Sequence, residues 1–267
     1  MQTSTFDRYQ SGDSPIHHLD PRVKVIITVL FILSNALIPD GVWLGFFLAL
    51  MLVLVITGWA GLTWSFALKR SLIVLPFTLA AVTIIFSMPG SPLGIIQIGP
   101  WALIPTDTGL IRFISIMFRS LLSVQMAILL TATTPFPDLI HAFRHLRLPQ
   151  PLVATLSFMY RYLFVLSDET TRLLRARRAR SASLPGKQSG GPLLWRAGVA
   201  GNMVGQLFLR SLERGDRVYQ AMLARGYTGH LYTLNPHIMQ RQDWLFAGLA
   251  SAYLLFIQVV CRIALFY

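Results

Sequence analysis

Cysteine and acidic residues are the scarcest features of this sequence. Cys261 is its one cysteine, so the chain can form no internal disulfide and offers no cysteine cage for a metal ion. Asp and Glu number 11 against 23 Lys and Arg, which gives a formal net charge of +12 at pH 7. Charged residues make up only 13% of the chain, whereas soluble domains average about a quarter. With 54% hydrophobic residues and a mean hydropathy of +0.58, the composition predicts an integral membrane protein.

The sequence also lacks the motifs that would let this chain use ATP or a proton gradient by itself. The chain has no G-x-x-x-x-G-K-[ST] loop, which ATP hydrolysis needs to hold the phosphates. Proton coupling favours a carboxylate at membrane depth, but all 11 acidic residues fall at the borders of the predicted spans or in predicted cytoplasmic segments. We therefore expect no catalytic residues and no cofactor in this chain, and an energy source outside it.

Long apolar stretches predict an all-α integral membrane protein with about five transmembrane helices. The predicted spans cover residues 25–39, 42–68, 71–88, 109–133 and 244–265. Asp20 followed by Pro21 predicts a capped helix start ahead of the first span. Pro39, Asp40 and Gly41 predict a tight turn after it.

The fourth span carries two arginines and follows a proline-rich segment. Residues 89–106 contain four prolines and no charge, and a short extracytoplasmic hairpin and an irregular loop fit them equally well. A charge within a span is costly unless it faces protein or water. We expect Arg112 to extend to the outer surface, and Arg119 to lie in the bundle interior or against a partner.

The uneven distribution of positive charge predicts the orientation in the membrane. Fifteen of the 23 Lys and Arg residues lie between Asp138 and Arg241, and on a membrane protein such a concentration indicates the cytoplasmic side. The polar N-terminus lacks the basic-then-apolar pattern of a signal peptide, so we expect no cleavage. With the N-terminus in the cytoplasm, five crossings put the C-terminus outside. We expect no nucleic-acid partner, which would favour a soluble fold with aromatics among the basic residues.

Two long amphipathic helices are predicted in the cytoplasm, over residues 151–182 and 192–225. Arg161 interrupts the first after about ten apolar residues, too few to cross a bilayer. Along the second runs an apolar stripe at helical spacing, which indicates a surface for a partner; its members are Val204, Phe208, Leu212, Tyr219 and Met222. Gly201 and Gly205 form a G-x-x-x-G pair that predicts the point where the two helices cross. A local weak point in the helix is the alternative reading of this pair.

These segments suggest a domain organisation in three parts. Residues 1–136 hold the N-terminal lead-in and four spans, 137–240 a cytoplasmic coupling domain, and 241–267 the last span. Residues 133–149 predict a short amphipathic helix along the inner membrane surface, with Leu139, Phe143 and Leu146 on one face. Near the middle of the first long helix, Ser167, Asp168 and Glu169 lie beside the arginines, and we expect them to be ion-pair partners rather than catalytic groups.

One face of the short amphipathic helix could hold a metal ion. Asp138, His141 and His145 lie at spacings of three and four residues. Such spacing can ligate a metal, which leaves a membrane-embedded metal-dependent enzyme as an alternative function. Because no further ligand is apparent, imidazoles that face water or lipid headgroups explain the pattern better, and we expect no metal site. A secondary carrier working alone is disfavoured because the chain has no evident inverted repeat.

The two long helices end in similar tripeptides of the form Ala-Arg-small. They are Ala179, Arg180 and Ser181 in the first helix and Ala224, Arg225 and Gly226 in the second. A small residue on each side lets a helix end enter a groove, and the guanidinium can bond carbonyls or carboxylates there. Two copies would suit a partner with two equivalent grooves, such as a dimer of ATP-hydrolysing subunits.

Four segments resemble the transmembrane T component of energy-coupling factor transporters, most closely the cobalt-type CbiQ proteins. They are LDPRVKV from Leu19, TTPFPDLIHAFRHLRLP from Thr133, MYRYLFVLSDETTRLLRARRARS from Met159 and FLRSLERGDRVYQAMLARGYTG from Phe208. The resemblance implies a coupling subunit of an ATP-driven importer in the bacterial inner membrane. The implied partners are two ATPase subunits, which bind ATP and Mg²⁺, a separate substrate-binding membrane subunit, and the lipid bilayer.

The resemblance also implies roles for individual residues. Carried over by position, Arg180 and Arg225 are the implied docking arginines. The family usually has Gly as the third residue of both tripeptides, so Ser181 departs from the pattern, and we expect it to reduce spacing tolerance without loss of docking. No substrate-binding residue carries over. The implied cargo is divalent cobalt, with nickel, or a vitamin through a shared module, as alternatives.

Overall fold

The computed structural model describes residues 9–10, 12–63, 69–92, 96–98, 101–103, 105–181, 192–229 and 239–266. The chain divides into two compact units, one of Met1–Ala142 with Pro236–Tyr267 and one of Phe143–Asn235. The division lies close to the predicted domain boundaries after residues 136 and 240, and it places the last predicted span in one unit with the other four.

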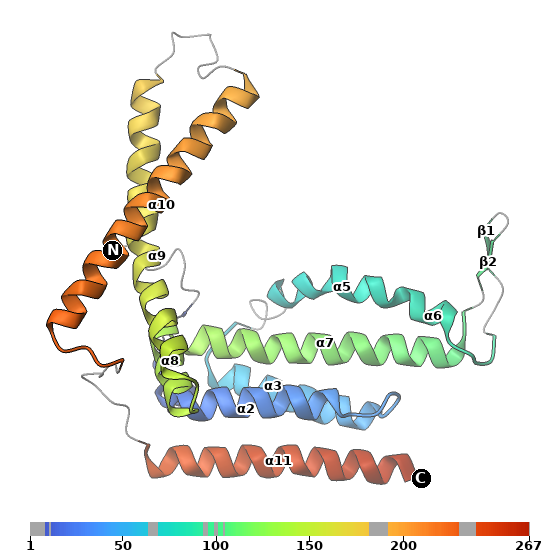
Figure 1. The fold of residues 1–267 in the computed structure, drawn as a ribbon. Coiled ribbons are helices and arrows are strands. Elements are labelled where there is room, and N and C mark those ends of the chain that lie inside the picture. Colours follow the sequence, from blue (N-terminus) through green and yellow to red (C-terminus); the bar gives the residue numbers. More distant parts are fainter. Residues whose placement is uncertain are drawn as a thin grey trace. The chain divides into compact units, whose positions relative to one another are not determined.

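The first unit consists mainly of helices. In chain order they are α1 (Pro15–His18), α2 (Pro21–Ala36), α3 (Trp43–Trp59), α5 (Leu75–Ala80), α6 (Ile84–Ser87), α7 (Asp107–Thr133) and α11 (Arg241–Phe266). Helix α8 (Phe136–His145) crosses the boundary between the units. Within the first unit, α2 and α3 both pack against α7 and α11, so these four helices lie alongside one another (Figure 1).

The helices confirm an all-α membrane protein, apart from one short hairpin. Among the described residues, three helical segments are long and apolar enough to cross a membrane: Lys69–Ser87, Asp107–Thr133 and Arg241–Ala264. Helix α3 is apolar but has only 17 residues, and α2 has 16. A bilayer core is about 30 Å thick, so the crossing of α2 and α3 stays a prediction.

The second predicted span is shorter than its apolar run. Helix α3 ends at Trp59, and Gly61 follows with a φ of +66°. The amide of Gly61 donates to the carbonyl of Gly58 at 3.1 Å, and that of Leu62 to Thr57 at 3.3 Å. This is the Schellman pattern that ends helices, so the prediction of a helix running on through Leu62 and Thr63 is wrong. Residues 64–68 lie outside the described residues.

The third predicted span is helical but irregular. Short 3₁₀ turns at Leu72–Val74 and Ala81–Thr83 flank α5, and Pro76 lies at the start of that helix. Proline has no amide hydrogen and removes one helical hydrogen bond, which accounts for a change of helix type at this position.

A hairpin precedes α7, which decides between the two alternatives for residues 89–106. Strands β1 (Ile96–Ile98) and β2 (Trp101–Leu103) pair antiparallel, with Ile96 opposite Leu103. Pro92 and Thr106 form an additional antiparallel bridge. Thr106 then caps α7, since its side chain accepts a hydrogen bond from the amide of Gly109.

The predicted start of α2 is confirmed. Asp20 Oδ1 accepts a hydrogen bond from the amide of Arg22 at 2.8 Å, and Pro21 occupies the first turn. A proline is tolerated there because the first amides of a helix have no partner within it.

Polar contacts tie the helices of the first unit together. Tyr253 Oη donates to the carbonyl of Leu48 at 3.0 Å, which joins α11 to α3. Gln258 Nε2 donates to the carbonyl of Ser34 at 2.7 Å, which joins α11 to α2. Asn35 Nδ2 donates to the carbonyl of Arg119 at 2.8 Å, which joins α2 to α7. Such hydrogen bonds matter in a bilayer, because contacts between apolar side chains are hardly more favourable there than contacts with lipid tails.

Arg119, predicted to lie in the bundle interior or against a partner, is half-buried and bonds the turn between α2 and α3, and Arg112 has a partner that the sequence did not reveal. Arg119 Nη2 donates to the carbonyl of Ile38 at 2.7 Å and to Asp40 Oδ1 at 3.1 Å. Arg112 Nε lies 3.6 Å from Asp40 Oδ2, and its side chain is 47% exposed. The two arginines of α7 thus meet one carboxylate in the turn between α2 and α3.

The second unit contains the two long helices. They are α9 (Gln150–Arg180) and α10 (Leu193–Ala224), as predicted to within two residues at each end. The connecting residues 182–191 lie outside the described residues. Figure 1 shows α9 and α10 crossing each other within this unit.

Candidate functional site

The crossing of α9 and α10 is held by an ion-pair cluster around Glu169. This carboxylate accepts a hydrogen bond from Arg172 Nη2 at 2.7 Å, one turn along α9. It also accepts a short hydrogen bond from Arg210 Nη1 on α10. The prediction that Glu169 pairs with arginines is confirmed. The bond from Arg172, followed by that from Arg210, holds the pKa of the Glu169 carboxyl below its usual value.

The crossing does not lie at the glycines that were predicted for it. A Cβ atom on Gly201 or Gly205 would meet no other described atom within 4 Å. The two helices are joined instead at Arg210, more than one turn further along α10. Within this chain the G-x-x-x-G pair therefore creates no close approach, because helices that cross through long charged side chains need no small residues.

The first Ala-Arg-small end closes without a left-handed residue. Helix α9 ends at Arg180, and the amide of Ser181 donates to the carbonyls of Arg177 at 3.0 Å and Arg178 at 3.2 Å. Ser181 has φ −105° and ψ 31°, which a serine adopts without strain. The departure from glycine at this position is therefore compatible with the local backbone. Three arginines in the last turn also interact favourably with the helix dipole.

The second Ala-Arg-small end depends on its glycine. After Ala224, the amide of Gly226 donates to Leu223 at 2.9 Å and that of Tyr227 to Met222 at 3.0 Å. Gly226 has a φ of +79°, the left-handed conformation that completes a Schellman cap. The third residue of this tripeptide is thus set by backbone conformation, in addition to the small size that the sequence suggested.

The tripeptide residues are accessible at the surface. Ala179, Arg180, Ala224, Arg225 and Gly226 are exposed, and Ser181 is half-buried. We call each Ala-Arg-small tripeptide the tip of its helix. At 1.5 Å per residue, Arg180 in the first tip lies about 16 Å along α9 from Glu169, and Arg225 in the second lies about 22 Å along α10 from Arg210. The C-terminal end of α9 and the C-terminal end of α10 lie on opposite sides of the point where the helices cross (Figure 1). A pair of stiff arms joined near their middles is suited to transmit displacement from one end to another.

The predicted apolar stripe on α10 is also largely uncovered. Val204, Phe208, Leu212 and Tyr219 are between 51% and 65% exposed. Contiguous apolar surface of this kind marks an interaction site or a membrane-facing surface.

The candidate metal ligands do not form a cluster. His141 is buried, whereas His145 is exposed at the end of the same helix. The residues that the structure describes contain no group of three or more His, Cys, Asp or Glu placed to hold a metal ion.

Sequence reasoning missed the partners of several charged groups. Glu169 was expected to pair locally, but its bond to Arg210 joins residues 41 positions apart. Asp40 was assigned to a turn, with no role toward Arg119 or Arg112. Spacing along the chain carries no signal for such pairs, because they depend on which helices pack together.

The family model and the similar proteins point to the same family. The family model described as cobalt transport protein, CbiQ, matches residues 12–237. The chain is 30% identical to the energy-coupling factor transporter transmembrane protein EcfT of Streptococcus equi, over 86% of this chain and 85% of that protein. It is 28% identical to EcfT of Lacticaseibacillus paracasei, over 93% and 95% of the two chains. It is also 26% identical to an uncharacterised protein of Methanocaldococcus jannaschii, over 93% and 85%.

Proposed function

This chain belongs to the CbiQ family, the transmembrane T components of energy-coupling factor transporters, and we propose that it couples two ATPase subunits to a membrane subunit that captures divalent cobalt. It is a membrane component of a transporter assembly. The geometry of α9 and α10 supports this coupling role. Each long helix ends in a surface-accessible Ala-Arg-small tripeptide, and the ion pair between Glu169 and Arg210 joins the two helices.

In the proposed mechanism the chain transmits motion and catalyses no reaction. Each ATPase subunit receives one tip, with Arg180 or Arg225 bonding carboxylates or carbonyls in its groove. ATP and Mg²⁺ are bound by these partners. When the ATPases close, the tips move relative to each other, and the ion pair at the crossing makes the two helices turn about a common point. The exposed stripe of α10 passes this movement to the substrate-binding subunit.

The assignment of cargo rests on the family alone. The CbiQ family is named for cobalt transport, whereas the names of the EcfT relatives mention no cargo. Nickel or a vitamin, captured by a different membrane subunit, would use the same coupling subunit. Cobalt uptake by membranes that contain the whole transporter, compared with nickel uptake, tests the assignment.

The proposed orientation places α9 and α10 in the cytoplasm of a bacterial cell, where ATP is available. It follows from the positive residues between Asp138 and Arg241. The N-terminus is then cytoplasmic and the C-terminus outside. Accessibility of introduced cysteines in a Cys261→Ser background, probed with a membrane-impermeant thiol reagent, tests this orientation.

Charge reversal at the tips tests docking. Arg180→Glu and Arg225→Glu should each abolish substrate uptake and weaken co-purification of the ATPases, while membrane insertion stays intact. Arg214→Glu is the matched control, since Arg214 is an exposed arginine of α10 away from its tip. Uptake at the wild-type level in both tip variants would overturn the proposal.

A further inference from the structure

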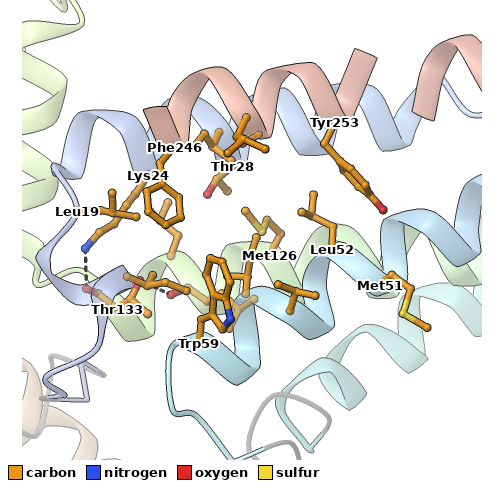
Figure 2. A pocket seen from close by; sticks show the side chains of 18 of the residues that line it. Leu19, Lys24, Thr28, Met51, Leu52, Trp59, Met126, Thr133, Phe246 and Tyr253 are labelled. Atoms are coloured by element: carbon orange, nitrogen blue, oxygen red, sulfur yellow. Dashed lines mark hydrogen bonds between the residues drawn. The ribbon is translucent and has the colours of Figure 1, made fainter. Parts of the chain in front are cut away.

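The first unit contains an apolar cavity of about 430 Å³ that the coupling function does not use. Its volume falls in the range of small-molecule sites, roughly 300–1,000 Å³. The lining residues come from the ends of α1 and α2 and from α3, α7 and α11. Figure 2 shows the side chains of Thr28, Leu52, Met126 and Phe246 around a common space, with α11 on one side and α3 on the other.

The walls of this cavity divide into a buried back and an exposed mouth. At the back, Thr28 of α2 and Met126 and Leu129 of α7 are 4%, 5% and 2% exposed. At the mouth, five lining residues are 41–74% exposed, and all lie on α3 or α11; they are Met51, Val55, Trp59, Leu245 and Leu249. Because these residues both line the cavity and face outward, the cavity opens sideways between α3 and α11.

Two contacts between α3 and α11 close the ends of this opening. Tyr253 Oη donates to the carbonyl of Leu48 at 3.0 Å. The rings of Trp59 and Phe246 meet edge to face, with centroids 6.0 Å apart. Between the two contacts the opening follows α3 from Met51 to Trp59, about 12 Å at 1.5 Å per residue. We call this opening and the cavity behind it the α3–α11 slot.

The contacts between α3 and α11 exclude a helix as the occupant of the slot. A helix with its side chains is about 10–12 Å across, and packed helix axes lie about 8–10 Å apart. Since α3 and α11 touch at both ends of the slot, no helix can enter between them without separating them. An extended hydrocarbon chain carries no side chains and needs no hydrogen bonds from the apolar walls.

Among the described residues that line the slot, Lys24 carries the one charged side chain, and the protein already engages it. Lys24 Nζ donates to the carbonyls of His17 at 3.1 Å and Thr133 at 3.2 Å, the second of which is drawn in Figure 2. Lys24 is therefore not available as the counter-charge of a phosphate, and this end of the slot suits the tail of an amphiphile rather than its headgroup.

We propose that the α3–α11 slot binds one acyl chain of a membrane phospholipid, with the tail inside the slot and the headgroup outside it. Helix α11 is long and apolar enough to cross the bilayer, so acyl chains are the medium at the mouth. The bound chain fills the space between α3 and α11 and supports their packing against α2 and α7. Acyl-chain occupancy is separate from the coupling role of α9 and α10.

Photolabelling of the whole transporter in lipid nanodiscs tests this assignment. A phospholipid with a diazirine at the end of its acyl chain should label Met126 and Thr28, which are buried from annular lipid. A phospholipid with the diazirine in its headgroup should leave both residues unlabelled. Label confined to outward-facing residues such as Leu255 with both probes would overturn the proposal.

A matched pair of substitutions on α11 gives an independent test. Ala250 lines the slot, whereas Ala252 is exposed and lies outside the lining. Ala250→Phe should abolish tail labelling of Met126, and Ala252→Phe should retain it. Equal labelling in the two variants, or crosslinks from Met126 to another polypeptide in place of lipid, would show that the occupant is not an acyl chain. If Ala250→Phe fails to fold, the comparison of the two probes on the wild-type chain decides.

Discussion

The carboxylate of Asp243 accepts a hydrogen bond from the backbone amide of Asp20, 223 residues earlier in the chain, at 3.0 Å. Its other oxygen accepts from the amide of Gln240 at 2.8 Å, just ahead of α11. One buried side chain therefore satisfies amides at the starts of both α2 and α11. The first and last predicted spans begin at a shared point.

We expect Asp243→Ala to destabilise the first unit. Without the Asp243 carboxylate, the backbone amides of Asp20 and Gln240 lose their hydrogen-bond acceptor. The loss should lower the free energy of unfolding by about 1–2 kcal/mol. Thermal unfolding of the purified chain in detergent measures the effect. Gln242→Ala, at an exposed neighbouring position, is the control, and equal unfolding midpoints for the two variants would contradict the shared cap.

Removal of Arg119 should cost more than removal of Arg112. Arg119→Leu leaves the carbonyl of Ile38 and the carboxylate of Asp40 without their donor. The cost should be about 2 kcal/mol, below that of a fully buried pair, because the side chains of Arg119 and Asp40 are 26% and 35% exposed. Arg112→Leu should change stability by less than about 1 kcal/mol. Denaturation of both variants under the same conditions ranks them, and the reverse order would refute the assignment.

Charge reversal at the crossing should separate α9 from α10. In Arg210→Glu, repulsion from Glu169 replaces attraction, and the distance between spin labels on the two helices should increase and broaden. The triple variant Glu169→Arg, Arg172→Glu and Arg210→Glu, which reverses all three charges of the cluster, should restore the wild-type distance distribution. The pair is exposed enough that global stability should change by only about 1 kcal/mol. Failure of the triple variant to recover would show that the ion pairs of this cluster do not hold the crossing.

The crossing should persist from neutral to mildly acidic pH. Because Arg172 and Arg210 lower the pKa of Glu169 below its usual 4.5, the folded state binds the proton less readily than the unfolded chain. The stabilisation is therefore fully present above the unfolded value, and it is lost only as the pH falls through the lower, folded value. Spin-label distances between pH 8 and 3 should change only at the acidic end. Glu169→Gln should show no such transition, and a wild-type transition between pH 7 and 5 would contradict the prediction.

Two glycines of the α10 segment should respond oppositely to alanine. Gly226→Ala places a Cβ at φ +79° and should destabilise the helix end by about 1–2 kcal/mol. Gly215 lies within α10, and a Cβ atom there would meet no described atom within 4 Å. Gly215→Ala should therefore stabilise the helix by up to about 1 kcal/mol. Hydrogen exchange of the amides of Gly226 and Tyr227 reports on both changes. Faster exchange in Gly215→Ala than in Gly226→Ala would refute the cap.

The sequence by itself determined the features that depend on neighbouring residues. The cap at Asp20, the extents of α9 and α10 and the membrane class all follow from spacings of a few residues or from bulk hydropathy. Helix α3 was predicted too long because an uncharged run hides its end, although Gly61 was a local signal for that end.

Only the tertiary structure decided which distant groups meet. The pairs of Asp40 with Arg119, Asp243 with Asp20, and Glu169 with Arg210 join residues whose separation follows no helical period. The position of the crossing and the slot between α3 and α11 also depend on how finished helices pack. In a bilayer this packing is selected by shape and a few polar contacts, since apolar side chains meet lipid and protein almost equally well.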